Sequence, residues 1–165
     1  MGLAPLFATN ILGWEKAGYS SLAGQANLFA GVICVVFIGS AASRWGARRL
    51  FIVGALLSFV GAAPMAALQA HWTNPALFIG AVFLFTTLAF LRGATGGSIA
   101  MRLCTPAVSP TQFAVFMAIF NLGRTAASVS LGWLDSLGGI PAMFAAMAIC
   151  SLVAAGFALV AKVKR

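Results

Sequence analysis

The chain has 165 residues, of which 62% are hydrophobic and 7% are charged, and its mean hydropathy is +1.03. These values argue against a water-soluble domain, whose surface needs far more polar residues. The net charge of +8 does not indicate nucleic-acid binding, because the basic residues lie between apolar segments and not in a patch interleaved with aromatic residues. A membrane protein is therefore expected.

Five apolar segments are long enough to cross about 30 Å of hydrocarbon, which takes about 20 helical residues. They are residues 22–42, 50–70, 75–99, 110–133 and 141–161. This pattern predicts an all-α fold, a polytopic membrane helix bundle in which residues 1–165 form a single transmembrane domain. Residues 1–12 are apolar but too short to cross, so we expect either an interfacial segment or the last turns of a helix whose beginning is missing.

The connectors contain residues that typically start, break or end helices. Asn74-Pro75 predicts a capped start with proline at the first helical position, and residues 109–112 (Ser-Pro-Thr-Gln) predict a capping box. Gly138-Gly139 predicts a tight turn before the fifth segment, and Pro64 predicts a kink inside the second. These features agree with the segment boundaries that hydropathy indicates.

Charge is distributed unequally between the two sides of the predicted bundle. One side holds seven cations: Arg44, Arg48, Arg49, Arg102, Lys162, Lys164 and Arg165. The other side holds one lysine, a histidine and both acids of the chain: Lys16, His71, Glu15 and Asp135. By the positive-inside rule, the first side and the C-terminus are expected to face the cytoplasm. The tryptophans lie at or just beyond the segment ends, as in an interfacial aromatic belt: Trp14, Trp45, Trp72 and Trp133.

Two arginines lie inside apolar segments that contain no acid. Arg124 is near the midpoint of the fourth segment, and Arg92 is nearer the cytoplasmic end of the third. A charge at membrane depth costs about 3 kcal/mol or more, so it usually marks a pathway or a bound ion. The alternative for Arg124 is a structural arginine satisfied by backbone carbonyls or by a carboxylate of another polypeptide. The alternative for Arg92 is a side chain that reaches the headgroups.

The other polar residues of the segments extend this candidate site. Asn121, Thr125 and Ser128 share one helical face with Arg124, and Asn27 lies in the first segment. Because polar side chains in membrane helices face protein or water, we expect the first, third and fourth segments to form an inner layer and the second and fifth an outer one. The candidate substrate-binding residues are Arg124, Asn121, Arg92, Thr125, Ser128 and Asn27. The alternative for the uncharged ones is hydrogen bonding between helices.

The segments contain no set of residues typical of catalysis. There is no Ser/His/Asp set, metal-ligand cluster or carboxylate pair within them, so we expect neither an enzyme nor a cofactor or metal site. Cys34, Cys104 and Cys150 are widely separated and are interpreted as small apolar side chains.

Residues 39–49 read GSAASRWGARR. This stretch resembles the Gly-x-x-x-Asp-Arg-x-Gly-(Arg/Lys) loop motif of the major facilitator superfamily, which joins the second and third, and the eighth and ninth, helices of those carriers. The matching residues are Gly39, Arg44, Gly46, Arg48 and Arg49. Ser43 stands where the family usually has aspartate, so the resemblance implies a tight turn with anchoring arginines but without the salt bridge of that aspartate.

Residues 106–113 and 121–124 (Pro-Ala-Val-Ser-Pro-Thr-Gln-Phe and Asn-Leu-Gly-Arg) are similar to the muropeptide and acetyl-CoA transporter subfamily. This resemblance covers nearly all the chain and implies the C-terminal half of a twelve-helix carrier. Residues 1–12 would then end helix seven, and the five segments would be helices eight to twelve. Such carriers bind substrate between two halves, so the chain is not expected to transport without its missing N-terminal six-helix half.

Two functions follow as hypotheses. The first is a fragment of a secondary active transporter that moves a polar or anionic, muropeptide-like solute across the bacterial inner membrane by alternating access. Proton coupling, which the family implies, would have to use the other half, because these segments contain no carboxylate. The second is a small, non-transporting membrane protein that binds partner helices or anionic membrane lipid through its basic cytoplasmic face.

Overall fold

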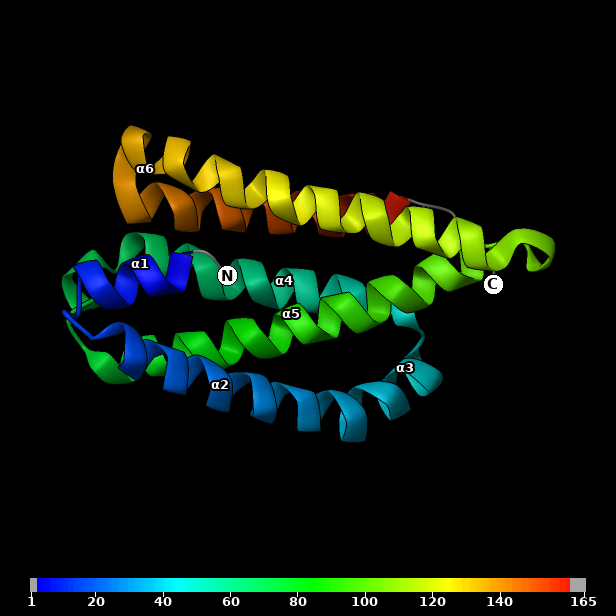
Figure 1. Cartoon of the computed structure of the whole chain (residues 1–165), viewed down its shortest axis with the longest axis horizontal. Coiled ribbons are helices and arrows are strands. Elements are labelled where there is room, and N and C mark those ends of the chain that lie inside the picture. Colours follow the sequence, from blue (N-terminus) through cyan, green and yellow to red (C-terminus); the bar gives the residue numbers. More distant parts are fainter. Residues whose placement is uncertain (1–2, 161–165) are drawn as a thin grey trace.

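The computed structural model describes residues 3–160, which are almost entirely helical and contain no strand (Figure 1). The helices in chain order are α1 (Leu3–Asn10), α2 (Lys16–Ile33), the π-helical turn η1 (Cys34–Ile38), α3 (Gly39–Trp45), α4 (Ala47–Ala67), the 3₁₀ turn η2 (Gln69–His71), α5 (Pro75–Leu103), the 3₁₀ turn η3 (Pro106–Val108) and α6 (Ser109–Val160). The predicted all-α fold is confirmed.

Four helical stretches are long and apolar enough to cross a membrane: Lys16–Trp45, Ala47–Ala67, Pro75–Leu103 and Pro106–Val160. The last of these is bent back on itself, because Gly138 (φ −171°, ψ 17°) and Gly139 (φ 63°, ψ −152°) are not helical. Figure 1 shows the two parts of α6 running in opposite directions, and we call residues 109–137 its first arm and residues 140–160 its second arm. The turn predicted at Gly138-Gly139 is confirmed, and so is a multi-pass membrane protein.

Half of the buried side chains among the described residues belong to α4 and to the second arm of α6. The buried residues of α6 are Ile140, Met143, Phe144, Ala148, Ser151 and Ala155, all in the second arm. In α4, Gly54, Ser58 and Ala62 are buried at intervals of four residues, which lets α5 approach closely. A Cβ atom added at Gly54 would lie 2.9 Å from Cδ2 of Leu91.

Burial within the described chain follows the polarity of the segments only in part. The third segment, expected in the inner layer, lies in α5, which buries five residues. The second and fifth segments, expected in the outer layer, also supply much of the core, whereas residues 118–130 in the fourth are all exposed. Contacts between helices depend on small residues and complementary shape, which hydropathy does not measure. The inner placement of the fourth segment stays a prediction, because its exposed polar face is able to face water or another polypeptide.

The short helix α1 is part of the core. Phe7 and Ala8 have no exposed surface, and the ring of Phe7 stacks on that of Phe78 with centroids 5.0 Å apart. Phe7 also contacts Trp72 and Phe144, at 5.2 Å and 6.4 Å between centroids. Residues 1–12 therefore contain a docked helix within the described part of the chain, and its aromatic contacts join α1 to α5 and the second arm.

The local signals at helix starts were partly correct. The side chain of Asn74 accepts a hydrogen bond from the Ala76 amide at 3.0 Å, as predicted. The capping box at residues 109–112 was wrong. The 3₁₀ turn η3 starts the helical run earlier, with Thr105 as its N-cap, and Gln112 Oε1 accepts bonds from the amide and hydroxyl of Thr105 at 2.7 Å and 2.9 Å.

The connectors gather at two opposite ends of the bundle (Figure 1). The turns at residue 46 and residues 104–108 share one end, and the turns at residues 11–15, 68–74 and 138–139 share the other. The basic connectors are therefore separated from the two acids, as the sequence indicated; Lys162, Lys164 and Arg165 lie outside the described residues. Trp72 departs from the predicted belt. It is 6% exposed and donates from Nε1 to the Met65 carbonyl at 2.9 Å.

Candidate solute-binding site

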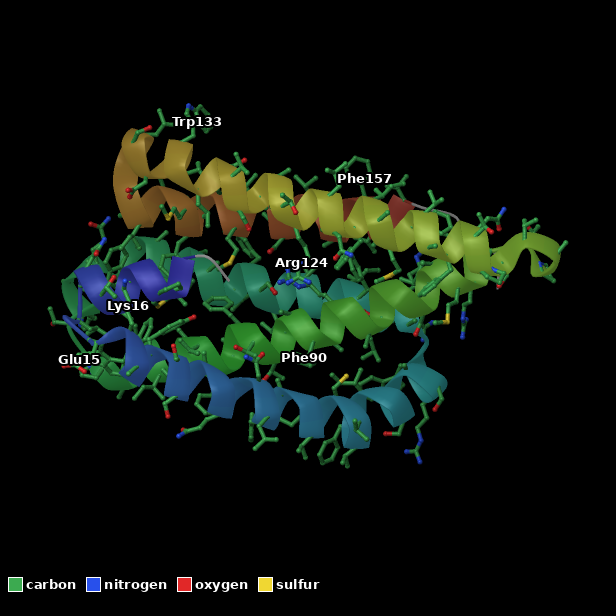
Figure 2. The ribbon with its side chains drawn as sticks, in the orientation of Figure 1. Glu15, Lys16, Phe90, Arg124, Trp133 and Phe157 are labelled. Carbon is green, nitrogen blue, oxygen red and sulfur yellow. The ribbon has the colours of Figure 1, made fainter. Side chains whose placement is uncertain are left out.

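Four polar residues lie together on one face of the first arm of α6. Arg124, Thr125 and Ser128 lie three, four and seven residues after Asn121, so the four share one helical face, and all four are exposed. We call them the Arg124 face. Figure 2 shows Arg124 near the middle of the long axis of the bundle and Glu15 at one end. A cationic, polar surface is thus presented far from both ends.

The helix itself satisfies the hydroxyl donors of this face. Thr125 Oγ1 donates to the Asn121 carbonyl and Ser128 Oγ donates to the Arg124 carbonyl, each at 3.1 Å. The oxygen lone pairs remain available as acceptors. Asp135, in the same arm, is eleven residues beyond Arg124, or about 16 Å along the helix axis. The acid is therefore too distant to neutralise the guanidinium directly.

A cavity of about 670 Å³ lies at one end of the Arg124 face. Ser128 and Leu131 of the first arm line it, opposite Pro5 and Thr9 of α1 and three residues of α2: Lys16, Tyr19 and Ser20. The lining is mostly apolar, and its polar part is one ammonium group and several hydroxyl groups, which are able to bond to a polar or anionic ligand. Sequence reasoning missed the contribution of α2. The available signal was the spacing of Lys16, Tyr19 and Ser20, which places three polar groups on one helical face.

Arg92 belongs to a different cavity. It lines a space of about 150 Å³ whose other lining residues are apolar and come from α1, α4, α5 and the second arm. The two cavities have no lining residue in common. Asn27, the remaining candidate, lines neither of them; it is exposed, and its amide donates to the Ala23 carbonyl at 2.8 Å. The six predicted site residues therefore divide into the Arg124 face, Arg92 and Asn27.

The loop motif is a very short turn. A single residue, Gly46 (φ 86°, ψ 139°), separates α3 from α4, and its positive φ favours glycine. Gly39 and Arg44 lie in α3, and Ser43 Oγ donates to the Ser40 carbonyl at 2.7 Å. Arg48 is an anchoring arginine, because Nε donates to the Ala158 carbonyl at 2.7 Å. Arg49 is exposed.

Comparison with protein-family models, with curated proteins and with solved structures gives no match to this chain. Within residues 3–160, no group of three or more His, Cys, Asp or Glu side chains is placed to hold a metal ion. The Arg124 face and the adjoining cavity offer a ligand the Arg124 guanidinium, the Lys16 ammonium and neighbouring hydroxyls.

Proposed function

We propose that this chain is one half of a secondary active carrier and that the Arg124 face is its share of the binding site for a polar or anionic solute. The observation that carries the proposal is the exposure of Asn121, Arg124, Thr125 and Ser128 at mid-depth in the bundle. Polar and charged side chains at membrane depth must face protein or water. A second helical bundle placed opposite this face would enclose a water-filled cavity between the two halves.

The 670 Å³ cavity supports a route for the solute. Lys16 and Tyr19 line it near the end of the bundle that holds Glu15, and Ser128 lines it on the side of the Arg124 face. An anion would meet the ammonium of Lys16 first and the guanidinium of Arg124 next. The hydroxyl groups between them suit a solute with many polar atoms. A muropeptide-like solute, which carries hydroxyl and carboxylate groups, fits this description.

The proposed topology counts each arm of α6 as one crossing, which gives five crossings and a docked helix α1. The end that holds Arg44, Arg48, Arg49 and Arg102 then faces the cytoplasm of a bacterial inner membrane, together with the C-terminus. The tight turn at Gly46 and the anchoring role of Arg48 support the resemblance of residues 39–49 to the loop motif of the major facilitator superfamily. In such a carrier the partner is the N-terminal six-helix half, which would also carry any proton-coupling carboxylate.

Cysteine accessibility tests whether the Arg124 face lines water. Asn121→Cys and Ser128→Cys would be made in the full chain with its three native cysteines changed to serine, and treated in native membranes with a charged maleimide. Leu122→Cys and Val129→Cys are matched controls, because these side chains are 69% and 75% exposed and lie on the apolar side of the same arm. We expect labelling of the polar face alone. Equal absence of labelling on both faces would contradict the proposal.

Transport tests the role of the arginine directly. The chain would be produced together with an N-terminal half of a muropeptide carrier, and uptake of a labelled muropeptide would be measured. Arg124→Ala is expected to lower uptake about tenfold or more, since hydrogen bonds to charged groups contribute about 1.5–3 kcal/mol, and Arg124→Lys should retain part of it. Arg102→Ala, at the exposed end of α5 and outside the loop motif, is the control. Unchanged uptake and affinity in Arg124→Ala would remove this residue from the site.

A second candidate function, a non-transporting protein that binds anionic lipid or partner helices, is favoured by one observation. Arg44, Arg49 and Arg102 are exposed together at the basic end of the bundle. Such a cluster attracts anionic headgroups by about 1 kcal/mol per basic residue. Purification distinguishes the two functions. A stable oligomer of this chain that retains anionic phospholipid and gives no uptake with any added half would favour the lipid-binding protein.

A further inference from the structure

The 150 Å³ cavity lies where α1, α4, α5 and the second arm of α6 meet. Helix α5 supplies one continuous face of it, from Phe78 through Phe85 and Ala89 to Arg92. These positions are separated by seven, four and three residues, so they share one helical face, and Arg92 lies fourteen positions, or about 21 Å, along the axis from Phe78. The cavity is therefore an apolar space that follows α5 and has a cation at one end.

Aromatic rings form the walls of the apolar part. Phe7 stacks on Phe78 at 5.0 Å, and Phe85 lies 6.3 Å from Phe144 between ring centroids. Phe78 and Phe144 are almost fully buried, so these walls are fixed by the core. An apolar cavity of about 150 Å³ holds a group of about the size of a benzene ring. The space thus accepts a compact aromatic or short aliphatic group.

The side chain of Arg92 is held in place along its stem and accessible at its end. A Cβ atom added at Gly54 would lie 3.3 Å from Cγ of Arg92, so α4 packs closely against the stem. Nε donates to the Leu88 carbonyl at 3.4 Å, a long hydrogen bond within α5. No side-chain nitrogen or oxygen among the described residues is both sealed and without a hydrogen bond. The terminal nitrogens of Arg92 are therefore able to meet a ligand in the cavity.

We propose that this cavity binds an anionic group joined to a compact apolar group, with the anionic group on the Arg92 guanidinium and the apolar group against the rings of Phe85 and Phe144. A guanidinium next to an apolar space selects for an anion joined to an apolar body, because each part of such a ligand meets its complement. This site does not depend on the Arg124 face, since Arg92 lines this cavity and no residue of the Arg124 face does. It therefore remains even if the chain is not part of a carrier.

The same chemistry has two sources, a free carboxylic acid and the acidic headgroup of a membrane phospholipid. A free acid would enter the cavity with its apolar group first and exchange with the medium. A headgroup would remain with the protein through purification in detergent. Both ligands would bind through Arg92. The experiment distinguishes them by whether the bound ligand exchanges with the medium.

The experiment uses the full chain in detergent micelles and two probes followed by fluorine NMR, 4-fluorophenylacetate and its neutral amide. We expect saturable binding of the acid and binding of the amide that is weaker by about tenfold or more, the effect of one hydrogen bond to a charged group. Arg92→Gln keeps the length of the side chain without its charge, so it should abolish the difference between acid and amide. Arg102→Gln is the matched control, because Arg102 is an exposed arginine of the same helix that does not line the cavity, and it should change the binding of neither probe.

A second variant tests the cavity itself. Ala89 is exposed on its open side, so Ala89→Phe should fill the space without disturbing the core and should abolish binding of both probes. Native mass spectrometry of the untreated protein then identifies the source. The site is assigned to a headgroup if the unmodified chain retains an anionic phospholipid that Arg92→Gln loses and that the acid does not displace. It is assigned to a free acid if the acid displaces the phospholipid. Three results would overturn the proposal: equal binding of acid and amide, no saturable binding together with no retained lipid, or the same loss in Arg102→Gln.

Discussion

Arg48, in the first turn of α4, donates a hydrogen bond from Nε to the carbonyl oxygen of Ala158, 110 residues away in the second arm of α6, at 2.7 Å. Its Nη2 donates to the neighbouring carbonyl of Leu159 at 2.6 Å. One guanidinium thus engages two consecutive carbonyls, and both bonds are charge-assisted. The contact joins the two most buried parts of the chain, α4 and the second arm, at the basic end of the bundle.

Arg48→Ala should destabilise the bundle by about 1–2 kcal/mol, because it removes two hydrogen bonds from a charged donor to backbone carbonyls that remain in place. The expected loss of stability is modest because the Arg48 side chain is only half-buried. Unfolding of the purified chain in mixed micelles as a function of dodecyl sulfate measures this change. Arg49→Ala removes the same charge from the adjacent exposed position and should have little effect. Equal losses in both variants would show that net charge, and not the contact, is responsible.

Phe7→Ala should destabilise the chain by about 3–5 kcal/mol, the usual cost of emptying a fully buried phenylalanine position. Phe7 has no exposed surface, and its ring contacts Phe78, Trp72 and Phe144. Because Phe7 is the aromatic anchor of α1, we also expect faster amide hydrogen exchange in residues 3–10. Phe37→Ala is the control, since Phe37 is 63% exposed. A loss below about 1 kcal/mol in Phe7→Ala would mean that α1 is not docked in solution.

Gly54→Val should weaken the packing of α4 against α5 by about 1–3 kcal/mol, the usual cost of overfilling a tight contact. A Cβ atom there meets Leu91 Cδ2 at 2.9 Å and Arg92 Cγ at 3.3 Å, and the added methyl groups have no free space. Gly93→Val changes another helical glycine, but a Cβ atom at Gly93 meets nothing within 4 Å. The difference in unfolding free energy between the two variants measures the effect of the contact between α4 and α5, because replacing glycine by valine changes the helix propensity equally in both. No difference would argue against close approach of the two helices.

Much of the fold was predictable because the membrane imposes a length and a polarity on each helix. Asn74 caps α5 as predicted, and the two glycines at residues 138–139 turn the chain where the hydropathy falls. Both signals depend on interactions within a few residues, so they do not depend on how the helices pack against one another. The bond from Thr105 to Gln112 did not follow from a local rule, because the 3₁₀ turn η3 shifts the start of the helix.

The arrangement of the site was less predictable. The four residues of the Arg124 face share a helical face by spacing alone, and the structure places them together. The sequence placed Arg124 near the midpoint of its segment and Arg92 nearer the cytoplasmic end, but it listed both as residues of one candidate site. Only the packing of α1 and the second arm around α5 places Arg92 in a cavity of its own. That packing depends on the complementary shapes of apolar side chains such as Phe7 and Phe144. Hydropathy does not distinguish these side chains from the other apolar side chains of the segments.

Gly139→Ala should disturb the turn that places the two arms of α6 in opposite directions. At φ 63° and ψ −152°, Gly139 lies in a backbone region that essentially only glycine adopts, so a side chain there costs about 1–3 kcal/mol. Gly132→Ala is the control in the first arm, where a Cβ atom meets nothing within 4 Å and the backbone is helical. It should leave stability unchanged or raise it slightly, because alanine favours helix more than glycine does.

Residues 118–130 of the first arm are all exposed in the described chain, so the turn is a main constraint on the direction of this arm. Double electron–electron resonance between spin labels at residues 122 and 153 would therefore show a broader distance distribution in Gly139→Ala than in Gly132→Ala, and identical distributions would show that other contacts orient the arm.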